Sequence, residues 1–218
     1  MDPPPHTPRA IGGSFEFSYQ FLKVKVTRMM FKPVDPILIF GNDAQSGSYI
    51  LRLKVHNPLE MAFGRFKRGK RIAVLAGRYV YVGSAMGEKG SASLGRRLLR
   101  HATRSGDKAP HAIRAVMLSR FKAIGLGSGD LRPPAGKKLH WNVDYLLDHP
   151  AVELSGALIF RSETRLEATL AKLLADDPAT FALEKGLGAN DAPGQTHLLG
   201  VYAGRELSLL QMINAPFL

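Results

Sequence analysis

The feature that most constrains the fold is an alternation of apolar and polar residues within the stretch GSYILRLKV at 47–55. Apolar side chains recur at every second position from Tyr49 to Val55, with Arg52 and Lys54 between them. Because successive side chains of a strand point to opposite faces, this period of two predicts a half-buried β-strand. The chain therefore needs a sheet that packs one face on a core.

Other patterns place strands and helices in separate parts of the chain. Ser93 and Ser162 are favourable N-cap residues for two of the expected helices. Further strands are expected at 61–66, 71–77, 78–83, 151–160 and 196–202, and helices at 94–104, within 107–125, at 140–149 and at 162–175. Early hairpins and later helices favour an α+β fold with an antiparallel sheet.

Shifts in composition predict the domain organisation. Residues 47–204 are predicted to form one domain, with a basic insert at 106–136 and a C-terminal tail at 205–218. The first 46 residues are rich in or broken by proline, which predicts an irregular and partly disordered N-terminal extension. An alternative is that the natural chain starts at Met29 or Met30.

Charge and cysteine content limit the classes of function. The net charge of +12 favours an anionic partner such as a phosphate backbone. The chain has no cysteine, which excludes disulfides, thiolate metal sites and cysteine nucleophiles. No apolar run reaches the roughly 18 residues of a spanning helix, and no signal-peptide pattern opens the chain. We therefore predict a cytoplasmic protein without a membrane partner.

Five residues form a candidate catalytic set. Tyr49 and Tyr81 lie on two expected strands, where an antiparallel sheet can bring them side by side. Arg97 and His101 are four residues apart and share one helix face. Glu167 lies on the last expected helix.

Such a set suits phosphodiester hydrolysis. A carboxylate binds a hard divalent cation, and that cation polarises phosphate oxygens. An arginine stabilises the charge that develops on the phosphorus oxygens, and a tyrosine or histidine takes the proton of the attacking water.

The sequence blocks that carry this set resemble a known family. GSY at 47–49, YVG at 81–83, the pair Arg97 and His101, and a downstream helical glutamate are similar to the GIY-YIG nuclease superfamily. Its largely uncharacterised Uri-like branch is the closer match, through GRYVYVGSA, GRRLLRH, KKLHWNVDYLL, RLEATLAKLL and GLGANDAPGQTHLL. The resemblance covers roughly residues 47–202, and the order and spacing of five blocks make it specific.

The resemblance implies a small antiparallel sheet of about three strands, flanked by helices, and hydrolysis of DNA with Mg²⁺ or Mn²⁺. It implies that Tyr49 and Tyr81 are the motif tyrosines, Arg97 the catalytic arginine and His101 its helix neighbour. We prefer Tyr49 as the base, although Tyr81 stays open. Glu167 is preferred to Glu163 as the metal ligand, because it precedes LA as in the family. The supporting residues are Gly83 (where the backbone is expected to turn), His140, Asp144, Asp191 and His197.

Some features depart from the family pattern. The first motif is Gly-Ser-Tyr rather than Gly-Ile-Tyr, and Ala192 and Gly194 stand where many relatives have cysteines. A cysteine-dependent metal site or bridge at that loop is therefore absent here. The five catalytic residues are all retained.

Each of these residues also has an ordinary structural interpretation. The strand tyrosines pack in cores, and His140 is expected to pack and to hydrogen-bond another site residue. Asp144 is expected to cap a helix or hold an arginine rather than bind metal. Asp191 and His197 either complete the site or brace the late loop.

Basic residues supply the expected contacts to DNA, and RNA is a further candidate. They are Arg65, Lys67, Arg68, Lys70 and Arg71 in the turn at 64–71, and Arg96 and Arg100 on the helix. A homodimer is one arrangement by which a small unit cuts both strands. Two alternatives to a nuclease are a non-catalytic nucleic-acid-binding module on the same fold and a basic, ribosome-associated structural protein.

Overall fold

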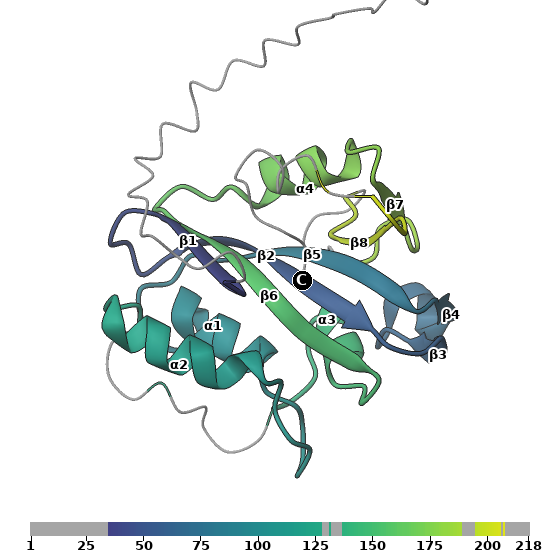
Figure 1. Ribbon diagram of the computed structural model, residues 1–218, viewed down its shortest axis with the longest axis horizontal. Helices are drawn as coiled ribbons and strands as arrows, with labels where there is room; N and C mark the ends of the chain where they lie inside the picture. Colours follow the sequence, from purple (N-terminus) through teal and green to yellow (C-terminus); the bar gives the residue numbers. More distant parts are fainter. Residues whose placement is uncertain (1–34, 128–130, 132–136, 189–194, 206, 208–218) are drawn as a thin grey trace, which may run out of the picture.

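The computed structural model describes residues 35–127, 131, 137–188, 195–205 and 207. Within these residues, six strands form one mixed sheet in the order β1-β6-β2-β5-β8-β7 (Figure 1). The strands are β1 (Ile37–Gly41), β2 (Gly47–Val55), β5 (Gly77–Ala85), β6 (Val152–Arg161), β7 (Thr180–Ala182) and β8 (Leu198–Val201). The α+β class is confirmed.

The expected three-stranded sheet is wrong in size. Its antiparallel centre is present, because β2 pairs with β5 on one side and with β6 on the other. β1 then adds to β6 in parallel, and β8 and β7 extend the sheet beyond β5. These additional strands cover edges of β6 and β5 that would otherwise leave unpaired backbone groups exposed.

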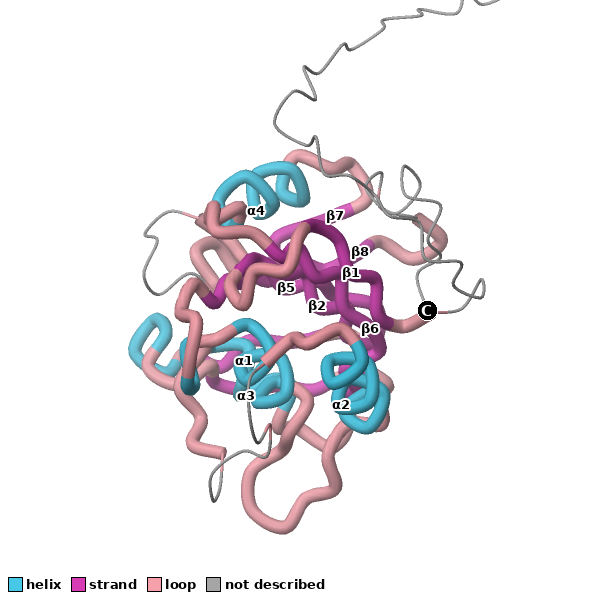
Figure 2. The backbone as a smooth tube through the Cα atoms, turned by 90° about the vertical axis from the view of Figure 1, so that its left-hand side faces the viewer, coloured by secondary structure: helices cyan, strands magenta, loops and turns pink. Residues whose placement is uncertain are grey.

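Helices cover both faces of the sheet (Figures 1 and 2). Helices α1 (Leu94–His101), α2 (Ile113–Ala123) and α3 (Asn142–Leu147) lie on one face, and α4 (Glu167–Ala175) lies on the other. A separate hairpin of β3 (Leu59–Ala62) and β4 (Arg71–Val74) leads into β5, and a 3-10 turn at Phe66–Gly69 lies between its strands.

The prediction that β2 is half-buried is wrong, because both of its faces are buried and each contributes to a separate core. Tyr49 and Leu51 belong to the core beneath α1, α2 and α3, whereas Ile50 belongs to the core beneath α4. Met117 and Phe121 of α2 are fully buried in the first core. The described part of the predicted insert at 106–136 is therefore integral to the packing of the sheet.

Two local expectations fail at helix starts. The last helix begins at Glu167 rather than 162, so Glu163 does not share a helix face with Glu167. The reason is a distant partner, because the Oγ atom of Ser48 on β2 accepts a hydrogen bond from Leu166 N at 2.9 Å. Ser93 stands at the start of α1 as expected, but its hydroxyl bonds to Gly90 O instead of capping the helix.

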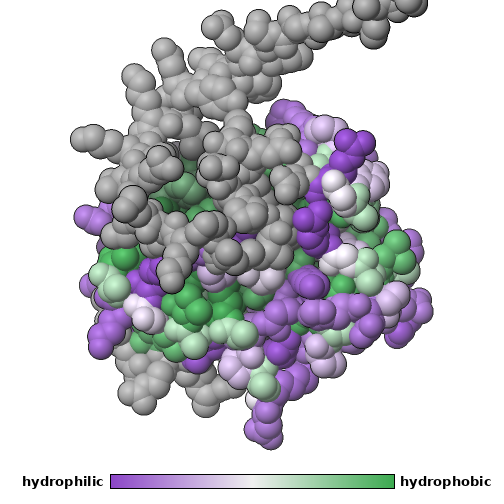
Figure 3. Space-filling model, in the orientation of Figure 1, coloured by the Kyte–Doolittle hydropathy of each residue, from purple (hydrophilic) through white to green (hydrophobic). Residues whose placement is uncertain are grey.

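Figure 3 shows hydrophilic and hydrophobic residues mixed over the described part of the face that it displays, and the projecting loop that connects α1 to α2 is mostly hydrophilic. No helix in the described segments is long and apolar enough to cross a membrane.

Candidate functional site

The candidate residues gather around the end of the sheet where β2 begins and β5 ends. Helix α1 is tied to this end by the hydrogen bond from Leu94 N to Gln45 O at 3.0 Å. The start of α4 is tied to it through Ser48. Ser48 and Ser84 are paired positions of β2 and β5, so both helices begin beside the same pair of strands.

Tyr49 and His101 form the centre of the site. The phenol oxygen of Tyr49 lies 2.8 Å from His101 Nε2, and both side chains are buried. The ring of Tyr81 lies 6.5 Å from that of Tyr49 and 6.0 Å from the imidazole, measured between centroids. The predicted proximity of the two tyrosines is confirmed, although the register places Tyr81 opposite Leu51 and therefore diagonal to Tyr49.

Gly83 has a different role from the expected backbone turn. It lies inside β5 directly opposite Tyr49, and its backbone does not have a positive φ. A Cβ atom at this position would lie 2.6 Å from both Cζ and the hydroxyl oxygen of Tyr49. The glycine therefore makes room for the tyrosine ring to cross the neighbouring strand.

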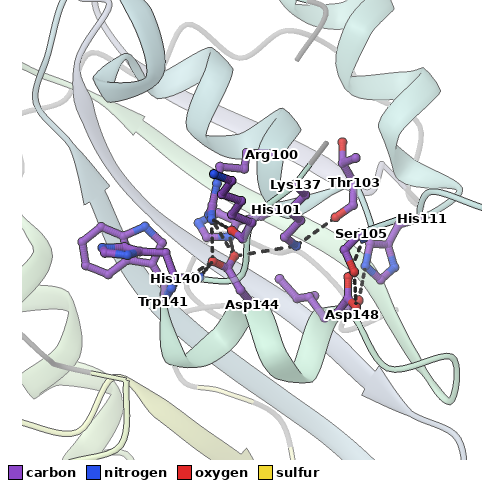
Figure 4. A network of polar contacts seen from close by, with 12 residues as sticks. Arg100, His101, Thr103, Ser105, His111, Lys137, His140, Trp141, Asp144 and Asp148 are labelled. Carbon is purple, nitrogen blue, oxygen red and sulfur yellow. Dashed lines mark hydrogen bonds and ion pairs between the residues drawn. The ribbon is translucent and has the colours of Figure 1, made fainter. Parts of the chain in front are cut away.

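Asp144 on α3 is the hub of a buried polar network (Figure 4). Its carboxylate accepts hydrogen bonds from the backbone N–H groups of His140 and Trp141 at 3.0 and 2.9 Å. It also pairs with Arg100 at 2.8 Å and lies 3.7 Å from the buried ammonium of Lys137. The expectation that Asp144 caps a helix and holds an arginine agrees with these contacts.

The same carboxylate faces the second nitrogen of His101. Asp144 Oδ1 lies 3.4 Å from His101 Nδ1, with an alignment outside hydrogen-bond geometry. We assign the Nδ1–H tautomer, because a ring N–H directed toward a carboxylate is favoured over a lone pair in that position. His101 Nε2 is then the acceptor for the Tyr49 hydroxyl.

Burial controls the ionisation of this cluster. It raises the pKa of Tyr49 and Tyr81 above the ordinary value, and the negative charge of Glu167 adds to both shifts. Burial lowers the pKa of His101 to about 4 against the opposing effect of Asp144. Burial alone would raise the pKa of Asp144, but His101, Lys137 and Arg100 hold it far below its usual range. At neutral pH the cluster thus holds neutral phenols, a neutral imidazole and a carboxylate.

Arg97 lies on α1 one turn before His101. Its guanidinium carbon lies 5.0 Å from the ring centroid of Trp141, in cation–π geometry. The ring of His140 meets Trp141 edge-on at 4.8 Å. The aromatic neighbour orients Arg97, and no acid among the described residues forms an ion pair with it.

Glu167 occupies a second cluster on the α4 side of the sheet. Its Oε2 accepts a hydrogen bond from Ser84 Oγ, and its Oε1 lies 3.3 Å from His197 Nδ1. Burial opposes ionisation, yet the contacts with His197 and Ser84 lower the pKa of Glu167 below its ordinary value. Glu167 therefore reaches Tyr49 and Tyr81 electrostatically rather than by contact.

An ionised carboxylate with 12% of its side chain exposed fits a divalent cation. Among the described residues, no group of three or more histidine, aspartate and glutamate side chains forms a ready-made metal site. A cation at Glu167 would therefore complete its shell with water and substrate oxygens, as Mg²⁺ commonly does.

Comparison with known proteins places the chain in a family. The sequence model of a domain of unknown function, DUF123, matches residues 48–214. The chain belongs to the DUF123 family. Neither a curated protein nor a solved structure gives a significant match. The match begins inside β2, so β1 lies outside the part of this protein that matches the DUF123 model.

The basic residues of this DUF123 domain differ in their partners. Lys67 and Lys70 of the turn both pair with Glu184, and Arg71 pairs with Glu60 at 3.6 Å. Among those predicted to contact DNA, Arg65 and Arg68 remain exposed on the turn, whereas Arg96 on α1 is partly buried. Arg100 is directed inward to Asp144 and to Lys138 O.

Sequence reasoning missed some of the DUF123 site. The sequence pattern gave Lys137 no role in the site, yet its side chain is 1% exposed and burial lowers its pKa to about 8. Ser84 directly follows the YVG motif in the sequence, and this position was the only sign of its contact with Glu167. Asp191 lies outside the described residues.

Proposed function

We propose that this DUF123 protein is a metal-dependent endonuclease that hydrolyses DNA phosphodiester bonds. The observation that carries the proposal is the alignment of Tyr49, His101 and Asp144, in which a phenol meets an imidazole that faces a carboxylate. A packing role for Tyr49 does not need its hydroxyl to meet a histidine whose other nitrogen faces an acid.

This alignment gives Tyr49 a way to act as a base while it remains a neutral phenol. The phenol oxygen takes a proton from the attacking water as its own O–H proton passes to His101 Nε2. The imidazolium formed in that step keeps its Nδ1–H toward Asp144, whose negative charge stabilises it. The low pKa of His101 keeps the imidazole neutral, and so able to accept the proton, at neutral pH.

Arg97 has the chemistry to stabilise the phosphate during the attack. A guanidinium offers several N–H donors in a plane that matches phosphate oxygens. Its position over Trp141 restricts its orientation before substrate arrives. Loss of such a preorganised charge costs activity more than it costs binding, because the phosphate gains charge in the transition state.

Glu167 is the proposed metal ligand, with Ser84 and His197 fixing its carboxylate. A bound Mg²⁺ or Mn²⁺ would polarise the phosphate and stabilise the leaving oxygen. The resemblance of the sequence to GIY-YIG nucleases supports this set of roles, since the same five residues stand in the family's order.

The alternative is a nucleic-acid-binding module without catalysis. The burial of Tyr49, which is 1% exposed, supports this alternative, because a base must reach the water that it activates. The contacts of Glu167 with Ser84 and His197 also support it, because they occupy carboxylate oxygens that a metal would need. Both proteins would bind DNA, but only the nuclease would cut it.

The test is single-turnover cleavage of end-labelled duplex and branched DNA with Mg²⁺ or Mn²⁺, together with binding measured in chelator. Glu167→Gln should abolish cleavage and retain binding. Glu163→Gln is the matched control, because it alters a neighbouring exposed glutamate outside α4 and should cut at the wild-type rate. Cleavage by Glu167→Gln at the wild-type rate would contradict the metal assignment, and binding without cleavage by the wild type would favour the alternative.

A further inference from the structure

A pocket lies beside the proposed site and has no part in the proposed chemistry. It has a volume of about 430 Å³ and is lined by residues 64–66 of the hairpin turn and by Leu139, His140, Asn142 and Tyr145 at the start of α3. This volume is within the range of small-molecule sites, roughly 300–1,000 Å³.

The lining combines three rings with one cation. Phe66 and Tyr145 are half-buried, while His140 and Arg65 are exposed. Gly64 lets the ring of Tyr145 lie against the backbone, because a Cβ at Gly64 would be 2.7 Å from the tyrosine hydroxyl oxygen. Aromatic side chains beside a guanidinium suit a planar ring whose attached backbone carries an anionic phosphate.

The pocket is connected to Arg97 by two ring contacts. His140 lines the pocket and meets Trp141 edge-on at 4.8 Å, and Trp141 carries Arg97 on its face at 5.0 Å. Figure 4 shows His140 and Trp141 together beside Asp144. A strand whose phosphate lies at Arg97 can therefore place a nearby base in the pocket.

We propose that this pocket binds one unpaired nucleobase of the DNA substrate, stacked on its aromatic walls. The inference rests on the proposed function and names its substrate class: DNA with a bulged, flipped or single-stranded base close to the cut. A base inside a duplex already stacks on its neighbours, so only an unpaired base has free faces for the pocket.

Binding of three fluorescein-labelled duplexes, measured by anisotropy in chelator, tests this inference without cleavage. One duplex is fully paired, one has a single unpaired base, and one has an abasic residue in place of that base. Stacking of one base on aromatic side chains changes affinity by about 5- to 150-fold. We expect the wild-type protein to bind the unpaired base at least about 5-fold more tightly than the abasic and paired duplexes.

Two pocket variants and one control locate the effect. Tyr145→Leu keeps an apolar side chain and removes the ring, and His140→Ala removes an exposed ring from the pocket wall. Both should lower the preference for the unpaired base toward one. Tyr202→Leu removes a 51% exposed ring outside the pocket lining and should retain the preference.

Equal affinity of the wild type for the base and the abasic residue would overturn the inference, as would a preference that survives in both pocket variants. If Tyr145→Leu does not fold, His140→Ala decides. The same duplexes incubated with Mg²⁺ or Mn²⁺ test the nuclease separately. Base preference without cleavage would support the base-binding pocket and contradict the nuclease. Cleavage without base preference would support the nuclease and contradict the base-binding pocket.

Discussion

Removal of a single oxygen atom tests the proposed proton path. Tyr49→Phe keeps the buried ring and deletes the hydroxyl that lies 2.8 Å from His101 Nε2. The nitrogen is then buried without a partner, which costs about 1–3 kcal/mol of unfolding free energy. Loss of a general base lowers the rate of the chemical step by about 10²- to 10⁴-fold. The loss of stability and the loss of catalytic rate can be separated, because one is measured by unfolding and the other by the rate of the chemical step.

Tyr79→Phe is the matched control. Tyr79 is also a buried strand tyrosine, 2% exposed, and its hydroxyl donates one hydrogen bond to Leu75 O at 2.9 Å. Its deletion should cost a comparable free energy of unfolding, about 1 kcal/mol, and leave cleavage unchanged.

The assays are urea unfolding and single-turnover cleavage at saturating protein, both at pH 7.5. We expect both variants to be destabilised and only Tyr49→Phe to lose the chemical step. Cleavage by Tyr49→Phe within about threefold of wild type would refute the role of the phenol as base. Equal losses of activity in Tyr49→Phe and Tyr79→Phe would assign the effect to stability instead.

Three further predictions follow from the same cluster. Gly83→Ala should displace the Tyr49 ring, lower the unfolding free energy by about 1–3 kcal/mol and reduce cleavage, as measured by thermal unfolding and DNA cleavage; an unchanged melting temperature would contradict the close contact. Asp144→Asn should destabilise the fold by about 3–5 kcal/mol and lower kcat, as measured by thermal unfolding and DNA cleavage. Its control is Asp148→Asn, which alters a carboxylate that accepts a hydrogen bond from Ser105 N after α1 and should lower stability without lowering kcat. Burial lowers the pKa of His101 to about 4, so the neutral imidazole that accepts the proton persists as the pH falls. A kcat–pH profile should therefore show no loss of activity from His101 between pH 8 and 6, and a loss only as the pH approaches 4. A loss centred near pH 6.5 would contradict that assignment.

The parts of the fold that the sequence predicted are those governed by local periodicity. The alternation from Tyr49 to Val55 identified β2, and the basic helix around Arg97 and the strand at 151–160 were also found. β1 was missed because Pro33 and Pro36 stand just before it in the sequence. Its four apolar residues Ile37 to Phe40 nevertheless pair in parallel with β6.

Long-range contacts account for the remaining errors. The start of α4 depends on Ser48, which is more than a hundred residues away and gives no local signal for Glu167 as the first helical residue. The role of Gly83 depends on the strand register. The role of Lys137 depends on its contact with Asp144 of α3, a helix that lies on the same face of the sheet as α1. Such contacts become visible only when the strands and helices are placed in space.

The most direct test of the central claim is nicking of supercoiled plasmid DNA by the full chain, with and without Mg²⁺ or Mn²⁺. Wild type and Glu167→Ala are compared at equal DNA occupancy. The nuclease assignment predicts metal-dependent nicks by the wild type that chelator removes and that Glu167→Ala does not produce. Plasmid that is bound but remains intact with either metal, or nicks of equal rate from both proteins, would contradict it.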